Sequence, residues 1–216
     1  MNISVRNLTG NELKNIEIPD SVFNVDFDPK IVNSVLRYGA LAQRSCTAST
    51  KNRSAVAGSG KKRRAQKKSG RARMGERNPV HHRGGSVAFG PNGRQYDISI
   101  NKKVRRLALK MVLSNKIANG DLIILDKLTA NECKTKEALK IKDTFGIKGR
   151  CVFVDSLENM GCADECLSNF WLSIRNVYDM DLESINTMNL KQIMSSNKVF
   201  LTEDALNDLL SVHGGE

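Results

Sequence analysis

One segment of the sequence, from Arg44 to Lys110, is too charged and too poor in large apolar side chains to join a folded core. It holds 19 Lys and Arg residues against two acidic residues, and it contains eight of the 16 Gly residues of the chain. No Leu occurs between Leu41 and Arg106. Such a composition cannot bury enough apolar surface to offset the conformational entropy that ordering costs. We therefore expect an extended basic loop, over residues 47–100, inserted into a folded domain.

The charge of the remaining chain has the opposite sign. It contains 15 basic and 21 acidic residues, whereas the whole chain of 216 residues has a formal net charge of +11. A concentrated positive charge favours a polyanionic partner, which is a nucleic acid, a membrane surface or an acidic protein. The same composition also fits a solvated, disordered linker. A long internal loop between two helical patterns is, however, more typical of a functional loop.

Short apolar runs alternate with helical patterns outside the basic segment, which is typical of a mostly parallel sheet covered on both faces. We expect a single α/β globular domain over residues 1–216, with three α/β/α layers and a sheet of about four strands. Residues 1–6 also alternate like a strand, without a predictable place in the sheet. Aromatic residues make up only 5% of the chain, which predicts an aliphatic core. The expected strands are 122–125, 151–154, 178–182 and 199–201, and the expected helices are 29–46, 101–119, 135–145, 163–177 and 202–210.

Several residues mark the ends of these helices. Asp28 precedes Pro29, a combination that favours a helix start, and Asn101 and Thr202 can cap two further helices. Asn119 and Gly120 end the helix that Asn101 begins. The apolar face of that helix should consist of Val104, Leu107, Ala108, Met111 and Val112.

The glycine-rich stretch does not form a nucleotide-binding loop. In the string Gly58 to Lys62, Ala55 stands where a P-loop needs its first Gly, and Lys62 stands where it needs Ser or Thr. No Rossmann glycine pattern is present, so we expect no nucleotide cofactor.

Metal binding and catalysis have equally weak signals. Cys162 and Cys166 are four residues apart, but Cys133 and Cys151 are isolated, so buried thiols are the simpler interpretation. The histidines are His81, His82 and His213, and none forms a pattern with a nucleophile. The acids Asp121, Asp126 and Asp155 flank strand ends, where turn residues are common. We expect no catalytic residue, no metal, no cofactor and no small-molecule substrate.

The sequence also predicts a protein of a reducing compartment that does not enter a membrane. No apolar run approaches the roughly 18 residues that a membrane span needs. The N-terminal residues lack the pattern of a secretory signal, and the five Cys residues have no disulfide-like spacing. We therefore expect a cytoplasmic location.

Nucleic-acid binding is the function that the basic segment favours most. Interleaved Gly residues let a backbone follow a phosphate surface closely, Lys supplies charge, and Arg can also stack on bases. Helix-turn-helix, zinc-finger and RNA-recognition-motif signatures are absent, so we expect an extended segment that becomes ordered on a folded RNA. The expected RNA-binding residues are Arg44, Lys51, Arg53, Lys61, Lys62, Arg63, Arg64, Lys67, Lys68, Arg71, Arg73, Arg77, Arg83, Arg94, Lys102, Lys103, Arg105 and Arg106.

An ordered set of short motifs in this segment resembles the bacterial large-subunit ribosomal protein four family. The first motifs are Gly58 to Lys62, Gln66-Lys67, and Ser69 to Arg73. They are followed by Arg83-Gly84-Gly85, by Val87 to Pro91, and by Lys102 to Leu109.

This resemblance implies a globular α/β domain on the outside of the large ribosomal subunit and a loop that penetrates ribosomal RNA. It places Gly60, Lys67 and Gly70 near the wall of the nascent-peptide exit tunnel and implies a role in early subunit assembly. The implied partners are large-subunit ribosomal RNA and neighbouring large-subunit ribosomal proteins, in a bacterial cytoplasm. The alternative is a free RNA-binding regulator of transcription or translation that uses the same loop.

The sequence departs from the family pattern at three places. Arg63, Arg64 and Ala65 replace a Pro-Trp-Arg string, Lys68 replaces a Gly, and His82 replaces an aromatic residue. The first change removes a Trp that could stack on RNA, while the added cations increase the affinity for phosphate.

Overall fold

The computed structural model describes residues 1–96, 98–130, 132–156 and 165–213, and it divides into two compact units. The first unit, here called the body, comprises Met1–Gly39 and Ser99–Glu216. The second unit, here called the loop unit, comprises Ala40–Ile98.

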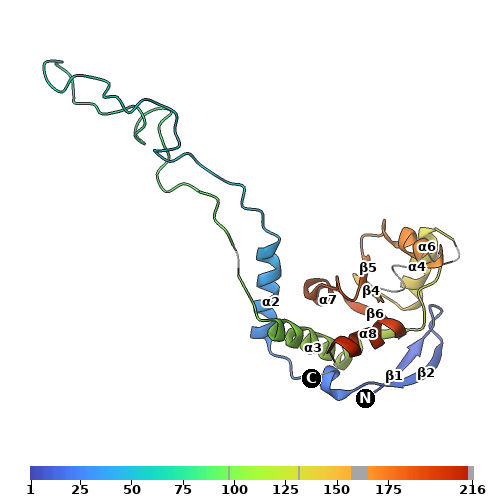
Figure 1. The fold of residues 1–216 in the computed structure, drawn as a ribbon. Helices are drawn as coiled ribbons and strands as arrows, with labels where there is room; N and C mark the ends of the chain where they lie inside the picture. The colour runs from blue at the N-terminus through green and yellow to red at the C-terminus, as the bar shows by residue number, and fades with distance from the viewer. Residues whose placement is uncertain (97, 131, 157–164, 214–216) are drawn as a thin grey trace. The chain divides into compact units, whose positions relative to one another are not determined.

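The body contains a six-stranded sheet in the order β2-β1-β3-β6-β4-β5 (Figure 1). All neighbouring strands are parallel except β1 and β2, which form an antiparallel pair. A mostly parallel sheet is thus confirmed. The strands are β1 (Asn2–Arg6), β2 (Glu12–Glu17), β3 (Leu122–Leu125), β4 (Cys151–Asp155), β5 (Met180–Ser184) and β6 (Lys198–Thr202).

The sheet has two strands more than expected, because the N-terminal hairpin adds β1 and β2. β1 pairs with β3 through Val5 and Ile124, which gives the strand-like N-terminus its place in the sheet. β2 has the sequence ELKNIE, and only Ile16 of its side chains is partly buried. A strand with so little apolar patterning cannot be recognised from sequence.

Helices cover both faces of the sheet. Those predicted near residues 29, 101, 135, 163 and 202 are all present. The first ends at Ala42 rather than at Cys46, and the start expected at Ala163 lies outside the described residues. Two short helices, α1 and α7, were not expected. The helices are α1 (Asp20–Phe23), α2 (Pro29–Ala42), α3 (Lys102–Ala118), α4 (Thr135–Thr144), α6 (Glu165–Ile174), α7 (Leu190–Ser195) and α8 (Glu203–His213).

Alternate residues of the strands enter two separate hydrophobic clusters, which confirms the three layers. On one face, Ile124 and Val154 pack with apolar residues of α1, α2, α3, α7 and α8. On the other face, Ile123 and Phe153 pack with residues of α4 and α6. The strands β3 and β4 are buried on both faces, which explains why their sequences are continuously apolar.

The second of these clusters is aromatic, so the expectation of an aliphatic core is wrong for this face. The rings of Phe153 and Phe200 stack with centroids 4.7 Å apart. Phe145 contacts Phe200 at 5.1 Å and Phe170 contacts Phe153 at 5.3 Å, both edge to face. Composition alone misleads here because four of the seven Phe residues converge on one site from distant parts of the chain.

The expected helix caps agree with the structure in two of three cases. The Oδ1 atom of Asp28 accepts a hydrogen bond from the N–H of Lys30 at 2.8 Å. The side chain of Asn101 makes no capping hydrogen bond.

The apolar face of α3 agrees with the prediction except at one residue. Ala108, Met111 and Val112 are buried as expected, whereas Leu107 is exposed.

Thr202 is the third cap and also joins β6 to the end of β4. Its hydroxyl group accepts from the N–H of Ala205 at 3.2 Å and donates to Oδ1 of Asp155 at 2.7 Å. Both Thr202 and Asp155 are only 2% exposed, so each bond lies in a largely dry environment. This hydroxyl group therefore serves as both donor and acceptor at one buried position.

We expect Thr202→Val to destabilise the body by about 2 to 3 kcal/mol, because it preserves the shape but removes both hydrogen bonds. Thr202→Ser keeps the hydroxyl group and loses one methyl group, so it should cost about 1 kcal/mol. Urea unfolding followed by circular dichroism measures both changes. Equal losses in the two variants would contradict the role given to the hydroxyl group.

Candidate nucleic-acid interface

The loop unit consists of two chain runs held together mainly by backbone hydrogen bonds. Beyond the end of α2 at Ala42, its described residues form neither helix nor strand, apart from one isolated antiparallel bridge between Ser49 and Asn92. The N–H of Thr50 donates to the carbonyl oxygen of Pro91 at 2.8 Å. These contacts fix how the two runs pair without giving them an apolar interior.

A compact turn between Asn78 and Ser86 is the best-ordered part of this unit by its hydrogen bonds. The carbonyl oxygen of Asn78 accepts from both the N–H and the hydroxyl group of Ser86, each at 3.0 Å. A Cβ atom on Gly85 would lie 2.0 Å from the carbonyl oxygen of Pro79, so only Gly fits there. Asn78 and Ser86 are the only buried residues among the described residues of the loop unit, and both are polar.

Glu76 is the only acidic residue in the described part of the loop unit. Its carboxylate forms an ion pair with the guanidinium group of Arg53. This pair joins the two chain runs and neutralises one cation. The remaining Lys and Arg residues of the described loop unit therefore have no acidic partner within it, and their charge is available to an external anion.

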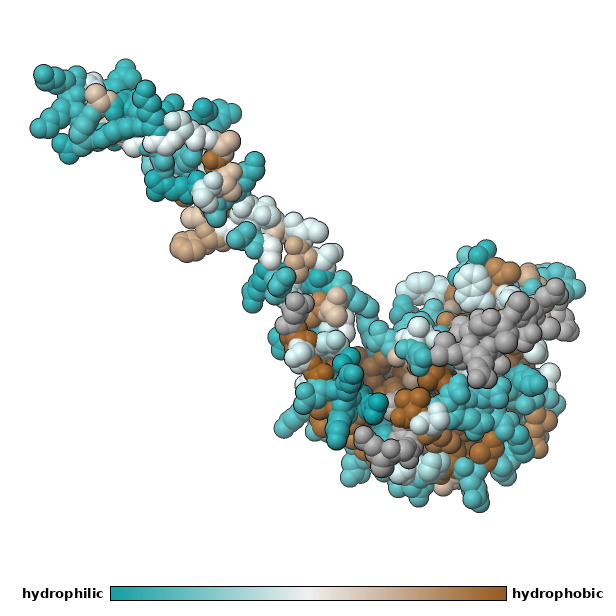
Figure 2. Space-filling view, in the orientation of Figure 1, coloured by the Kyte–Doolittle hydropathy of each residue, from teal (hydrophilic) through white to brown (hydrophobic). Residues whose placement is uncertain are grey.

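The basic residues predicted to bind nucleic acid are exposed, with one exception. Arg64 is half-buried, whereas all the others have exposed side chains. Figure 2 shows the loop unit covered mainly by hydrophilic residues. Lys102, Lys103, Arg105 and Arg106 belong to the body, where they occupy the first turns of α3.

Two of these arginines are held against an aromatic ring that the charge pattern did not reveal. The guanidinium carbon of Arg44 lies 4.3 Å from the ring centroid of Tyr96, and that of Arg94 lies 5.3 Å from it. In the body, Arg105 contacts the ring of Tyr38 in the same way at 5.3 Å. Such contacts restrict the side chains, so less entropy is lost when the guanidinium groups bind.

Phe89 is a further candidate that reasoning from charge missed. It is the only Phe in residues 47–100, its side chain is fully exposed, and its backbone has a φ angle of 52°. An exposed aromatic ring on a cationic segment is suited to stack on an unpaired base. The signal was present in the sequence, because Phe89 is the only aromatic residue between His82 and Tyr96 in a segment too polar to form a core.

Two departures from the family pattern have visible consequences. Lys68 stands where the family has Gly, and its φ angle of 64° lies in the left-handed region, which costs roughly 1 to 2 kcal/mol for a residue with a Cβ atom. Burial lowers the pKa of His82, and the positive potential of His81 and Arg63 lowers it further. His82 is therefore held in its neutral form and can act as an aromatic surface.

The other sequence candidates have structural roles or lie outside the described residues. Asp155 accepts the hydrogen bond from Thr202 described above. Burial raises the pKa of the Cys151 thiol to about 12, so it stays protonated, whereas Cys133 is exposed. Cys162 lies outside the described residues, as does the side chain of Cys166. Within the described ranges, no three His, Cys, Asp or Glu residues cluster as metal ligands would, and no helix has the length and apolar character to cross a membrane.

Comparison with known proteins places these features in a family. The model of the ribosomal protein L4/L1 family matches residues 16–212. The chain is 37% identical to the large ribosomal subunit protein uL4 of Phytoplasma mali, over 93% of both chains. It is 34% identical to the uL4 proteins of Lactobacillus acidophilus, over 98% of both chains, and Desulforapulum autotrophicum, over 96% of both chains.

Proposed function

The chain belongs to the ribosomal protein L4/L1 family, and on that premise we propose that it is a structural component of the large ribosomal subunit that binds ribosomal RNA. The family is structural and non-enzymatic, so the chain is not an enzyme. The resemblance recognised in the motifs from Gly58 to Leu109 is thereby confirmed. RNA binding is the more detailed part of the proposal and rests on the chemistry of the loop unit.

One observation carries the proposal of RNA binding: the loop unit exposes a dense set of cations, and the one acid among its described residues is already paired with Arg53. With no apolar residue buried among its described residues, this unit has no core to stabilise it. Cations that lack internal partners repel one another, and a polyanion removes that repulsion while releasing its own counterions. Folded RNA supplies phosphate groups on several sides of a thin chain.

We also propose where the loop and the body lie in the large subunit. We expect the loop of residues 47–100 to reach toward the nascent-peptide exit tunnel, with Gly60, Lys67 and Gly70 closest to it. The body would lie on the subunit surface, where it meets neighbouring large-subunit proteins. A role in early assembly follows if the loop orders the RNA around it. In a bacterial cell this function places the protein in the cytoplasm.

Sedimentation of a cell lysate through a sucrose gradient tests the central proposal. The protein should travel with large subunits and 70S particles, at about one copy for each large subunit, because a structural component stays bound. Quantitative mass spectrometry against another large-subunit protein measures that ratio. Recovery mainly in the slowly sedimenting fractions would favour the alternative of a free RNA-binding regulator.

The salt dependence of RNA binding tests which side chains supply the affinity. Replacing Lys67, Lys68, Arg71 and Arg73 with Ala should flatten the slope of log K against log salt by roughly 2 to 3, at about 0.7 for each lost phosphate contact. Filter binding to protein-free large-subunit ribosomal RNA at several salt concentrations measures the slope. The control variant removes the same charge from exposed residues of the body: Lys127, Lys136, Lys140 and Lys191. An equal effect in the control would show that net charge alone matters.

Phe89→Ala should behave differently from the loss of cations. We expect it to weaken RNA binding by about 1 to 3 kcal/mol at every salt concentration, because base stacking releases no counterions. The slope against salt should not change. Val80→Ala is the matched control, since Val80 is an exposed apolar residue of the same unit. Unaltered affinity in Phe89→Ala would exclude stacking by this ring.

A further inference from the structure

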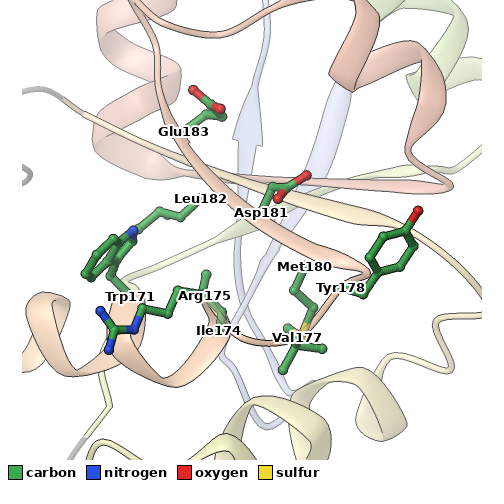
Figure 3. Close-up of a pocket in the computed structure, with 9 residues that line it drawn as sticks. All are labelled: Trp171, Ile174, Arg175, Val177, Tyr178, Met180, Asp181, Leu182 and Glu183. Atoms are coloured by element: carbon green, nitrogen blue, oxygen red, sulfur yellow. The ribbon is translucent and has the colours of Figure 1, made fainter.

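A pocket of about 300 Å³ lies at the β5 edge of the sheet, where it is lined by residues of α6, of β5 and of the turn between them (Figure 3). Its lining combines the large side chains of Trp171 and Tyr178 with charged residues of both signs. Trp, Tyr and Arg are the residue types that contribute most to protein interfaces.

The strand beside the pocket has an open edge. β5 pairs with β4 on one side, and among the described residues no strand pairs with its other side. The N–H of Cys151 donates to the carbonyl oxygen of Asp179, so alternate residues of β5 bond to β4 and Leu182 presents its N–H and C=O groups outward. An extended peptide can use such groups to add a strand to the sheet.

The aromatic residues at this edge remain largely exposed despite their size. Trp171 is 45% exposed, and the guanidinium carbon of Arg175 lies 5.4 Å from its ring centroid. Tyr178 is 81% exposed, and Arg150 both contacts its ring at 5.1 Å and donates a hydrogen bond to its hydroxyl group at 2.7 Å. The side chains of both arginines are thus held in place by aromatic rings.

The two acidic residues of the strand differ in whether their carboxylates already have hydrogen-bond partners. Glu183 accepts hydrogen bonds from Gln192 and Thr187, at 2.6 and 2.8 Å. Asp181 is exposed and has no hydrogen-bond or ion-pair partner among the described residues. Figure 3 shows its carboxylate directed away from the side chains of Leu182 and Trp171. This position attracts a cation and repels a phosphate group.

We propose that the outer edge of β5 docks an extended, basic segment of a neighbouring large-subunit protein, which adds a strand beside Leu182. A Lys or Arg of that segment pairs with Asp181, and an apolar side chain covers the ring of Trp171. This inference rests on the proposed function, because the docked segment belongs to another protein of the large ribosomal subunit. The exposed carboxylate and the open backbone groups favour a peptide over RNA as the occupant.

Site-directed photo-crosslinking in assembled ribosomes tests this inference. The full chain carries p-benzoylphenylalanine at position 178, and purified large subunits are irradiated. We expect a crosslink to an extended basic segment of another large-subunit protein, identified by mass spectrometry. Adding Asp181→Lys should lower the yield at least fivefold, because the cation then faces another cation. Glu17→Lys, the same change on the opposite edge strand β2, should leave the yield unaltered.

The outcomes separate this inference from the proposed function. A wild-type chain that does not travel with large subunits contradicts the proposed function. Normal incorporation with a crosslink to ribosomal RNA, to a second copy of this chain or to nothing overturns the docking inference alone. If the substitution at position 178 prevents incorporation, the probe moves to position 175, which also lines the pocket, and the same outcomes apply. A probe at Leu13 on β2, which is 51% exposed, controls for non-specific crosslinking.

Discussion

The separation of charge along the chain is the constraint on which the rest of the structure depends. An unpaired charge is costly to bury, so a segment with many cations and one described acid cannot contribute to a core. Glu76 is already used by Arg53, and the residues that the loop unit does bury, Asn78 and Ser86, are polar and hydrogen-bonded. Its local structure is therefore a set of turns and backbone pairings. Its remaining charge is left for an external polyanion.

The body must then fold without help from more than a quarter of the chain, and its sheet makes this possible. The strands β3, β4 and β6 are apolar on both faces, so helices from the N-terminal and C-terminal parts of the body can cover them. One cluster is mainly aliphatic, and the other is built around Phe153 and Phe200. Thr202 and Asp155 connect two of these strands through a buried hydrogen bond. The body therefore has a complete core of its own.

The sequence predicted those features that depend on long or strongly biased patterns. The apolar strands and five of the helices were predicted correctly, because full burial removes polar residues from both faces of a strand. β2 was missed because four of its six residues are polar, and α1 and α7 were missed because they have only four and six residues. Exposure of the cations followed from charge alone. The contacts of Arg44 with Tyr96 and of Asn78 with Ser86 join residues far apart in the chain or depend on turn geometry, so no periodic pattern could reveal them.

The two edges of the sheet differ in the surface that they offer to a partner chain. Two charged residues of the edge strand β2 are paired within the body, since Lys14 pairs with Glu203 and Glu12 pairs with Arg6, both at 2.7 Å. Charged side chains on an edge strand discourage pairing with other chains. The edge at β5 instead places Trp171 close to the exposed carboxylate of Asp181. The docking that we propose would therefore use the β5 side of the sheet and not the β2 side.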